Sequence, residues 1–321
     1  MKCLVTGAAG FIGSHLCEHL LHDGHAVVGL DAFISYYSRA VKEANLAGFR
    51  HHPSFVFHEL DLRSDPLEAA LDGIEAVFHL AAMPGLPKSW TDFDLYQGCN
   101  IQATQRLLEA LRPFTGLHRF VYASTSSVYG RYSSGDEELL TRPISPYGVT
   151  KLAAEFLCRA HAEEFGLPLA ILRYFSVYGP RQRPDMGYHR FIHALLHSQP
   201  VVVYGDGLQV RGNTFIDDCV GATVAALRAP IGEVYNIGGG ETANVWEILA
   251  KLESILGRRA IIRREPARPG DQRFTAADTR RIARHLDWHP CVGLDEGLGR
   301  QAAWQQFAPA PVEIREVVSA R

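Results

Sequence analysis

The sequence predicts an α/β protein built on a doubly wound parallel sheet, with a second, smaller α/β domain. Two observations lead to this prediction. In the first half of the chain, short apolar runs rich in β-branched and aromatic residues alternate with segments of helical periodicity. After residue 175 the sequence pattern changes, because glycine and proline are frequent and indicate loops at residues 179–187, 204–207, 237–241 and 265–271.

The elements of the larger domain follow from this alternation. Strands are expected at residues 3–6, 26–31, 54–59, 75–80, 118–124 and 169–174. Strands that alternate with helices form right-handed βαβ units, which place helices on both faces of the sheet. We assign residues 1–175 to this domain, with returns of the chain near 213–240, where a helix (215–228) and a strand (233–237) are expected. Residues 176–307 form mainly the smaller domain, and residues 308–321 are expected to be a mobile tail.

Composition and charge exclude several classes of protein. Hydrophobic residues make up 47% and charged residues 21% of the chain, as in soluble globular proteins. The net charge of -3 provides no basic field, so nucleic acid is not an expected partner. The N-terminal apolar run is too short for a secretory signal or a membrane span. The six cysteines show no CxxC pair and no metal-ligand spacing, so we expect no metal site, reduced thiols and a cytoplasmic location.

A glycine-rich loop separates the first strand from a helix expected at residues 11–21. Its glycines have GxxGxxG spacing, which lets the backbone approach a pyrophosphate whose charge sits on free amides at the helix N-terminus. The loop therefore predicts a dinucleotide bound in a Rossmann arrangement, although a cluster of turn glycines could give the same pattern. The expected contacts are Gly7, Gly10, Phe11, Ile12 and Gly13.

An acidic residue closes the second strand. Asp31 stands 18 residues after Gly13, where a carboxylate can accept hydrogen bonds from an adenosine ribose. A ribose phosphate would be repelled there, and Ala32 and Phe33 supply no arginine to compensate, so NAD is favoured over NADP. A solvated surface aspartate remains the alternative. Further cofactor contacts are expected at the ends of other strands, from Asp61, Leu62, Leu80, Ala81, Ala82 and Tyr174.

A tyrosine and a lysine stand four residues apart on the helix expected at residues 145–165. This spacing puts Tyr147 and Lys151 on one helical face, where an ammonium favours the phenolate and lowers the pKa of the tyrosine. Tyr147 is therefore a candidate general base, although the spacing alone is common by chance. Three hydroxyls, of Thr125, Ser126 and Ser127, follow the fifth strand at the carboxyl edge, where open α/β sheets bind ligands.

As a set, these motifs resemble a known family. TGAAGFIG, HLAA, STSSVYG, YGVTK, LRYFSVYGP and GDGLQVRGNTFIDD occur in the order found in extended short-chain dehydrogenase/reductases acting on nucleotide sugars, the NAD-dependent epimerase/dehydratase family. The resemblance covers roughly residues 1–305. It implies that Tyr147 is the base, that Lys151 orients the nicotinamide ribose, and that Thr125 bonds the reacting sugar hydroxyl. It also implies a homodimer through helices around residues 101–111 and 147–165, and a nucleotide diphosphate held by Arg211, Arg268 and Asp271, each of which could instead be a surface charge.

The branches of this family differ in the residues after the threonine. Dehydratases have an Asp-Glu pair there, and decarboxylases of UDP-glucuronate have a Glu at the second place. This chain has Ser126 and Ser127. With no second acid or base, the resemblance implies 4-epimerisation through a 4-keto sugar.

The sugar is suggested by the segment that follows the sixth strand. Ser176 followed by GPxxRPDM resembles UDP-glucuronate 4-epimerases, as does YYSRAVKEANL at residues 36–46. Arg183 and the hydroxyls of Ser126, Ser127 and Ser176 suit a substrate that carries a carboxylate, because charge-assisted hydrogen bonds are the stronger kind. Arg183 could instead form a salt bridge within its loop. Relatives often read GVR where this chain has GLPK, so Lys88 either replaces that arginine contact or the contact is missing.

The expected reaction is therefore UDP-glucuronate to UDP-galacturonate with NAD. A UDP-glucose/UDP-galactose 4-epimerase is the first alternative, and a decarboxylase or reductase the next. A non-catalytic NAD-binding sensor is the alternative outside enzymes. The joint presence of Thr125, Tyr147 and Lys151 argues against it, because a binding module has no need of an activated phenol.

Overall fold

A seven-stranded parallel sheet organises the larger part of the molecule. The computed structural model describes residues 1–307. The strand order is β12-β7-β5-β4-β1-β2-β3, and every neighbouring pair is parallel. The order reverses beside β1, as in doubly wound Rossmann sheets, so the predicted fold class is confirmed. The strands are β1 (Lys2–Thr6), β2 (Ala26–Asp31), β3 (Phe55–Glu59), β4 (Ala76–His79), β5 (Arg119–Thr125), β7 (Leu169–Tyr174) and β12 (Val234–Ile237).

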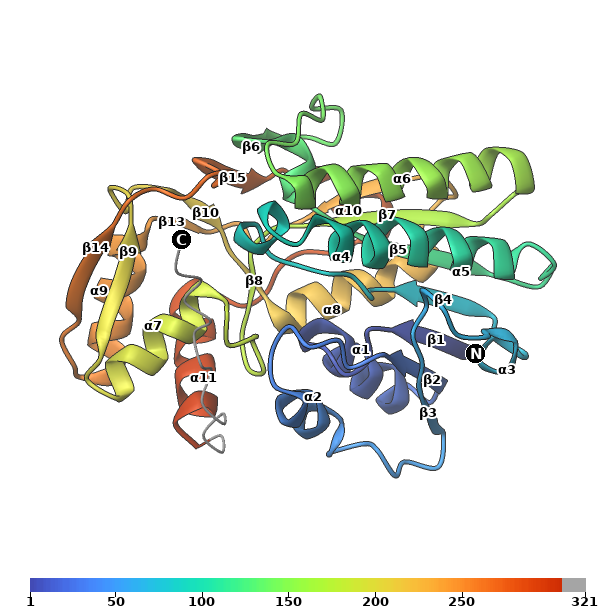
Figure 1. Cartoon of the computed structure of the whole chain (residues 1–321), viewed down its shortest axis with the longest axis horizontal. Helices are drawn as coiled ribbons and strands as arrows, with labels where there is room; N and C mark the ends of the chain where they lie inside the picture. The colour runs from blue at the N-terminus through green and yellow to red at the C-terminus, as the bar shows by residue number, and fades with distance from the viewer. Residues whose placement is uncertain (308–321) are drawn as a thin grey trace.

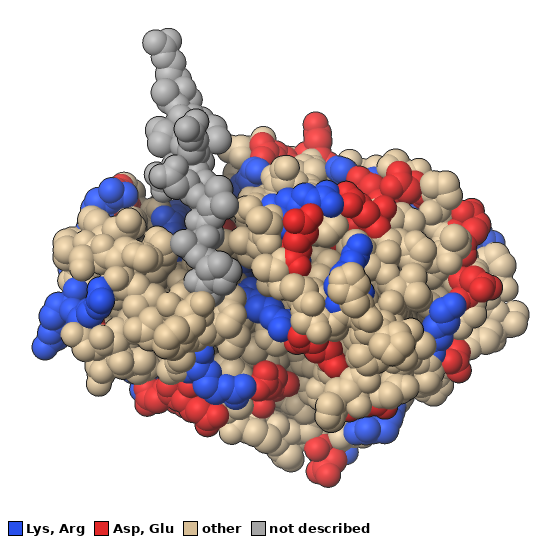
Figure 2. Space-filling model, turned by 90° about the horizontal axis from the view of Figure 1, so that it is seen from below, with Lys and Arg blue, Asp and Glu red and all other residues tan. Residues whose placement is uncertain are grey.

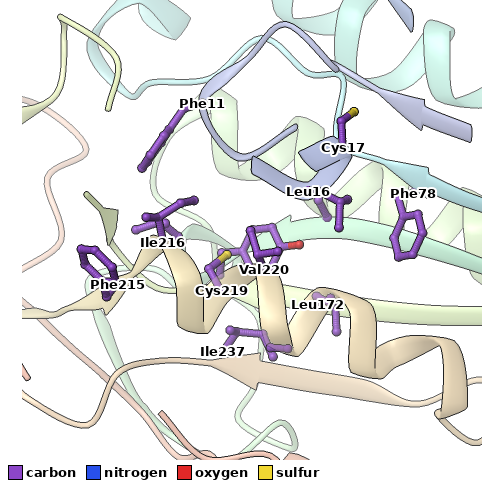
Figure 3. Close-up of a cluster of buried hydrophobic side chains, with 14 of the residues drawn as sticks. Phe11, Leu16, Cys17, Phe78, Leu172, Phe215, Ile216, Cys219, Val220 and Ile237 are labelled. Carbon is purple, nitrogen blue, oxygen red and sulfur yellow. The ribbon is translucent and has the colours of Figure 1, made fainter. Parts of the chain in front are cut away.

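Helices cover both faces of this sheet (Figure 1). On one face lie α1 (Phe11–His22) and α8 (Ile216–Ala225), which contact each other although about 200 residues separate them. Figure 3 shows their side chains, among them Leu16, Cys219 and Val220, packed against Phe78 and Leu172 of the sheet. On the other face lie α5 (Ala103–Leu111) and α6 (Pro146–Phe165), packed on Leu4, Phe120 and Tyr122. Alternate strand residues therefore supply two separate cores.

Shorter helices complete this part. They are α2 (Arg39–Leu46), α3 (Glu68–Leu71), α4 (Phe93–Gln97), α10 (Arg280–Leu286), a π turn (Gly98–Gln102) and 3-10 helices at Pro87–Trp90, Ser126–Tyr129 and Ala226–Arg228.

A smaller group of elements lies beside the carboxyl edge of the sheet (Figure 1). The helices α7 (Gly187–Leu196), α9 (Val245–Leu256) and α11 (Leu294–Phe307) contact one another, and β9 (Pro200–Tyr204) pairs in parallel with β14 (Ile261–Glu265). Two-stranded pairs join this group to the sheet: β6 (Tyr132–Gly135) with β15 (Phe274–Ala277), β8 (Val177–Tyr178) with β11 (Thr214–Phe215), and β10 (Arg211–Gly212) with β13 (Thr242–Ala243).

The remaining expectations concern metal ligands, membrane-spanning helices, surface charge and the C-terminal tail. Among residues 1–307, no group of histidine, cysteine, aspartate or glutamate side chains could hold a metal ion. Within the same residues, no helix has the length and apolar character needed to cross a membrane. Acidic and basic side chains are interspersed over the face seen in Figure 2. The tail expected at 308–321 lies outside the described residues.

Candidate active site

One cavity of about 540 Å³ runs along the carboxyl edge of the sheet. It opens where β1, β2, β4, β5 and β7 end, which is where an open parallel sheet binds its ligands. Of the residues expected from the sequence to form a site, all except Lys88 line this cavity: Gly7, Gly10, Phe11, Ile12, Gly13, Asp31, Asp61, Leu62, Leu80, Ala81, Ala82, Thr125, Ser126, Ser127, Tyr147, Lys151, Tyr174, Ser176, Arg183, Arg211, Arg268 and Asp271.

The glycine loop at one end of the cavity has no room for side chains. Gly7 has a φ of +73°, and a Cβ there would stand 3.0 Å from the backbone nitrogen of Ala81. A Cβ on Gly13 would stand 2.1 Å from the carbonyl oxygen of Gly7. Gly10 precedes α1 and supplies no side-chain cap, so the first amides of this helix are available to an anion. The loop fits the pyrophosphate of a dinucleotide.

Asp31, at the end of β2, has a cationic neighbour that the sequence argument missed. Its Oδ1 atom accepts hydrogen bonds from the backbone N–H of Phe33 at 2.8 Å and from Lys42 Nζ at 3.2 Å. Lys42 is buried and lines the cavity. The argument for NAD considered only the residues directly after Asp31, whereas Lys42 lies one helix further along the chain. Its contact with Asp31 depends on how α2 packs against the end of β2, which no local sequence pattern indicates.

The backbone after β4 is fixed by a buried polar chain. Thr6 Oγ1 accepts hydrogen bonds from the backbone N–H groups of Leu80 and Ala81 at 3.1 and 3.0 Å, and it lies 2.8 Å from Nδ1 of His79. Burial lowers the pKa of His79 to about 3, so its ring is neutral. This arrangement holds the HLAA segment against Gly7, as expected from its small residues. Asp61, by contrast, bonds both the backbone and the guanidinium of Arg63, so its side chain is engaged in a cap.

Thr125, Tyr147 and Lys151 all line the cavity, and Thr125 forms a hydrogen bond with Tyr147. Thr125 ends β5, whereas the other two lie on the first turns of α6, which begins at an N-cap where Ser145 accepts a hydrogen bond from the Gly148 N–H at 3.1 Å. Burial raises the pKa of Tyr147, and a hydrogen bond to Thr125 and the positive charge of Arg183 act in the opposite direction. Lys151 was expected to lower this pKa but is not among these influences. Its own pKa falls to about 7 because it is buried, so near neutral pH it is only partly charged.

The cluster of hydroxyls formed by Thr125, Ser126 and Ser127 has a further hydrogen-bond partner, Gln272, which the sequence argument also missed. Gln272 lines the cavity directly after Asp271, one residue beyond the loop expected at 265–271. Its Nε2 donates to the carbonyl oxygens of Ser126 and Gly130, at 3.2 and 2.8 Å. Ser126 Oγ in turn donates to Gln272 Oε1 at 3.4 Å. The amide therefore fixes the turn that carries Ser126 and Ser127.

Arg183 both faces the cavity and forms a salt bridge within its own loop, the two alternatives that the sequence left open. It lines the cavity, and it also forms a two-fold ion pair with Asp185, from Nε and Nη2, at 3.0 Å each. The Tyr36 hydroxyl donates to the same carboxylate at 3.3 Å. Burial alone would raise the pKa of Asp185, but the paired Arg183 holds it below its usual range. Arg183 is therefore held in position by its own loop and by the segment at residues 36–46.

Two arginines, Arg211 and Arg268, and the carboxylate of Asp271 line another part of the cavity. Burial lowers the pKa of Arg211, and the charge of Asp271 acts in the opposite direction. The Arg268 guanidinium lies 3.3 Å from the centre of the Tyr204 ring, and burial raises the pKa of the nearby Asp271. Two half-buried cations that share one nearby carboxylate leave positive charge for an anionic ligand.

Lys88 does not line the cavity. Its Nζ lies 3.3 Å from Asp92 and 5.4 Å from the centre of the Tyr36 ring, whereas Pro87 faces the cavity in its place.

The chain is similar over most of its length to a known family and to several of its members. The model of the NAD dependent epimerase/dehydratase family matches residues 3–238. The chain is 45% identical to an uncharacterized UDP-glucose epimerase, YtcB, of Bacillus subtilis, over 95% of this chain and 98% of the relative. It is 37% identical to the UDP-glucuronate 4-epimerase of Thermodesulfobacterium geofontis, over 94% and 95%. The crystal structure of UDP-glucuronic acid 4-epimerase from Bacillus cereus, in complex with UDP-glucuronic acid and NAD, superposes with a TM-score of 0.92 at 45% identity, over 95% of this chain and 99% of that one.

Proposed function

The chain belongs to the NAD-dependent epimerase/dehydratase family, and on this basis we propose that it is an isomerase that converts UDP-glucuronate to UDP-galacturonate. One observation carries the proposal. A single cavity joins a dinucleotide loop to Thr125, Tyr147 and Lys151, and then to Arg183 and two further arginines. The activities named for the similar proteins from Thermodesulfobacterium geofontis and Bacillus cereus support the same reaction.

The residues of the cavity fit NAD. The loop from Gly7 to Gly13 would hold the pyrophosphate, Asp31 with Lys42 the adenosine ribose, and Lys151 the nicotinamide ribose. When bound, NAD supplies a reversible hydride acceptor beside the sugar. In this proposal residues 1–175, with the returns at 213–240, hold NAD, and residues 176–307 hold mainly the nucleotide sugar.

Tyr147 is the proposed general base. As the phenolate, its oxygen takes the proton of the sugar 4-hydroxyl and becomes the phenol, which returns that proton after the 4-keto sugar has turned in the site. Thr125 bonds the Tyr147 hydroxyl and holds it at the reacting end of the cavity. Ser126 and Ser127 cannot serve as an acid-base pair at ordinary pH. The site therefore lacks the acid and the base that would catalyse the elimination of water. Return of the hydride to the other face of the sugar is the remaining outcome.

The carboxylate of the sugar is proposed to bind Arg183 and the hydroxyls of Ser126, Ser127 and Ser176. A 4-keto glucuronate is a β-keto acid, which loses carbon dioxide when its carboxylate bond lies perpendicular to the ketone plane. An epimerase must therefore fix the carboxylate. The ion pair with Asp185 keeps the Arg183 guanidinium in one place. The same carboxylate also neutralises part of the positive charge that would attract the carboxylate of the sugar. For that reason, and because the similar YtcB is named a UDP-glucose epimerase, interconversion of UDP-glucose and UDP-galactose is the second candidate.

The nucleotide is proposed to occupy the part of the cavity that Arg211 and Arg268 line. These two cations share the carboxylate of Asp271 and would neutralise the diphosphate. A second cavity of about 120 Å³ shares Asp185, Gly187 and Arg268 with the first and is lined by the strand β9. It offers apolar walls for the base.

We also propose that the enzyme is a cytoplasmic homodimer. Three large apolar side chains of α6 lie on the surface, and two of them face the same way: Val149 is 47% exposed and Phe156 is 61% exposed, whereas Phe165 ends the helix. Val149 and Phe156 are seven residues apart, so they share one face of the helix, beside α5 in Figure 1. A second copy of the chain is the proposed cover for this face.

The test is to incubate the protein with UDP-glucuronate and NAD and to identify the sugar formed. An epimerase gives UDP-galacturonate, a decarboxylase releases carbon dioxide, and a sensor leaves the sugar unchanged. A parallel incubation with UDP-glucose examines the second candidate.

A further inference from the structure

A buried ion pair lies directly behind the catalytic residues. Glu155 follows Lys151 by one helical turn and Tyr147 by two, so the three side chains lie along one side of α6. Its partner is Arg173 of β7, whose Nη2 lies 2.7 Å from Oε2 and whose Nε lies 3.0 Å from Oε1. The two side chains are only 1% and 5% exposed. The pair is therefore shielded from water.

A serine of β5 completes the shell around the carboxylate. Ser124 directly precedes Thr125 and stands beside Arg173 in the register of β5 and β7. Its hydroxyl donates a hydrogen bond to Oε1 of Glu155. The carboxylate thus accepts three hydrogen bonds from the two strands that end at the cavity, and it connects them to the helix of Tyr147 and Lys151.

The arginine extends this connection to the hydroxyl cluster. Arg173 Nη1 donates to the Tyr129 hydroxyl at 2.8 Å, and that hydroxyl donates to Asn236 of β12 at 2.8 Å. Tyr129 ends the 3-10 helix that carries Ser126 and Ser127. Apolar side chains of similar volume generally stabilise a fold as well as a buried ion pair does, so stability alone gives no reason for these charges.

The surroundings of Lys151 give a second reason to assign Glu155 a role in the active site. The titratable groups that act on or contact Lys151 come from three elements: Glu155 and Cys158 of α6, Tyr122 of β5 and His79 of β4. Tyr147 stands one helical turn before Lys151 and lines the same cavity. Burial keeps the pKa values of Cys158 and Tyr122 well above neutral and that of His79 near 3, so these three are uncharged at pH 7. Burial of Lys151 itself opposes its positive charge. Glu155 is the carboxylate in this set.

We propose that Glu155, held by Arg173 and Ser124, is a positioning residue of the active site. It seats α6 on β5 and β7 so that Tyr147 meets Thr125, and its charge raises the share of Lys151 in the ammonium form, which can hold the cofactor ribose. The part of this inference that concerns the cofactor rests on the function proposed above.

The ionisation of Lys151 can be measured without any turnover. The chain has only five lysines, so reductive methylation with carbon-13 formaldehyde gives few NMR signals to assign: Lys2, Lys42, Lys88, Lys151 and Lys251. In Glu155→Gln, which keeps the shape of the side chain, the titration midpoint of Lys151 should fall by roughly one pH unit relative to the wild type. The other four midpoints should stay in place.

A matched control separates charge near Lys151 from burial of a carboxylate in general. Glu137 is also buried, pairs with Arg281 at 3.2 Å and accepts a hydrogen bond from the Asn236 N–H at 2.8 Å, but it is not among the groups that influence Lys151. Glu137→Gln should leave the Lys151 midpoint unchanged. An unchanged midpoint in Glu155→Gln, or an equal fall in both variants, would overturn the proposal.

A second variant covers the case in which Glu155→Gln does not fold, because Arg173 is then left as a buried, unpaired charge. Glu155→Leu combined with Arg173→Met removes both charges together and should fold. Its Lys151 midpoint should also lie below that of the wild type, and a wild-type midpoint here would equally overturn the proposal.

The steady-state kinetics of Glu155→Gln provide an independent test of the proposal. For Glu155→Gln, kcat should fall by about ten-fold with KM for the sugar nearly constant, and the alkaline limb of the kcat profile should move to lower pH, because Lys151 loses its proton earlier. A uniform loss of activity with an unmoved pH profile would contradict the role assigned to Glu155. If wild-type enzyme does not act on UDP-glucuronate, the proposed function fails while the titration of Lys151 still decides the present inference.

Discussion

Tyr147 carries the proton transfer in the proposed reaction, so its hydroxyl can be tested alone. Tyr147→Phe keeps the packing of the ring and removes the base, and kcat should fall by roughly 10²–10⁴-fold while NAD binding is retained. Steady-state kinetics and an NAD titration measure the two effects. Tyr235→Phe is the matched control, since it removes the hydroxyl of a buried tyrosine that bonds His285 and does not line the cavity. Wild-type turnover in Tyr147→Phe would rule out the assigned base.

Arg183 is the residue that should distinguish the two sugars. A guanidinium that binds a carboxylate contributes about 1.5–3 kcal/mol, so Arg183→Ala should lower kcat/KM for UDP-glucuronate by roughly ten- to a hundred-fold. Residual turnover of UDP-glucose should change little. Because the charge of Arg183 also lowers the pKa of Tyr147, the two sugars are to be compared above the acidic limb of the pH profile.

Arg181→Ala provides the control for that experiment. Arg181 lies in the same loop but pairs with Glu18 of α1 at 2.8 Å instead of lining the cavity. Equal losses on both sugars in Arg183→Ala would mean that Arg183 serves the diphosphate or the fold, and would favour the UDP-glucose reaction.

Individual residues also show where sequence reasoning stops. Gly7, Gly13 and Asp31 could be found because their spacing from a strand is fixed by local backbone geometry. Lys42 and Gln272 reach the cavity from elements whose packing no local pattern encodes. The charge of Lys151 depends on its burial, which spacing along a helix does not reveal.

The glycine loop is the element whose geometry is most restrictive. A Cβ on Gly13 would overlap the carbonyl of Gly7, so Gly13→Ala must displace the turn that faces the pyrophosphate. Overpacking of this kind costs typically about 1–3 kcal/mol, and NAD should bind roughly ten- to a hundred-fold more weakly. Calorimetric titration with NAD measures the loss. Gly299→Ala, in α11 with nothing within 4 Å, should bind NAD as the wild type does. Equal affinity of Gly13→Ala and wild type would show that this loop does not hold NAD.

Among the elements, all six strands expected from the sequence of the larger domain are present, as are α1, α6, α8 and β12. Each has a long apolar run or a clear helical period. The two-residue strands β8, β10, β11 and β13 were not expected. Strands of this length are made by contacts between distant segments, such as Thr214 with Val177, and carry no periodicity of their own.

In the whole molecule, the exposed apolar face of α6 predicts a dimer. Phe156→Asp places a charge at the centre of the proposed interface, which should weaken association by at least about 2 kcal/mol, or roughly thirty-fold in Kd. Light scattering after size exclusion measures the change in mass. Val56→Asp is the control, because Val56 is 52% exposed on β3 at the opposite edge of the sheet. A wild-type protein that is monomeric at micromolar concentration would contradict the dimer.

The central claim concerns the whole enzyme and can be tested in one incubation. Purified protein, NAD and UDP-glucuronate are combined in D2O, and the sugar nucleotides are followed by proton NMR. The account predicts a mixture of UDP-glucuronate and UDP-galacturonate that reaches equilibrium, with the hydrogen on carbon 4 retained and no release of carbon dioxide. An unchanged spectrum with UDP-glucuronate, alongside interconversion of UDP-glucose and UDP-galactose under the same conditions, would contradict it.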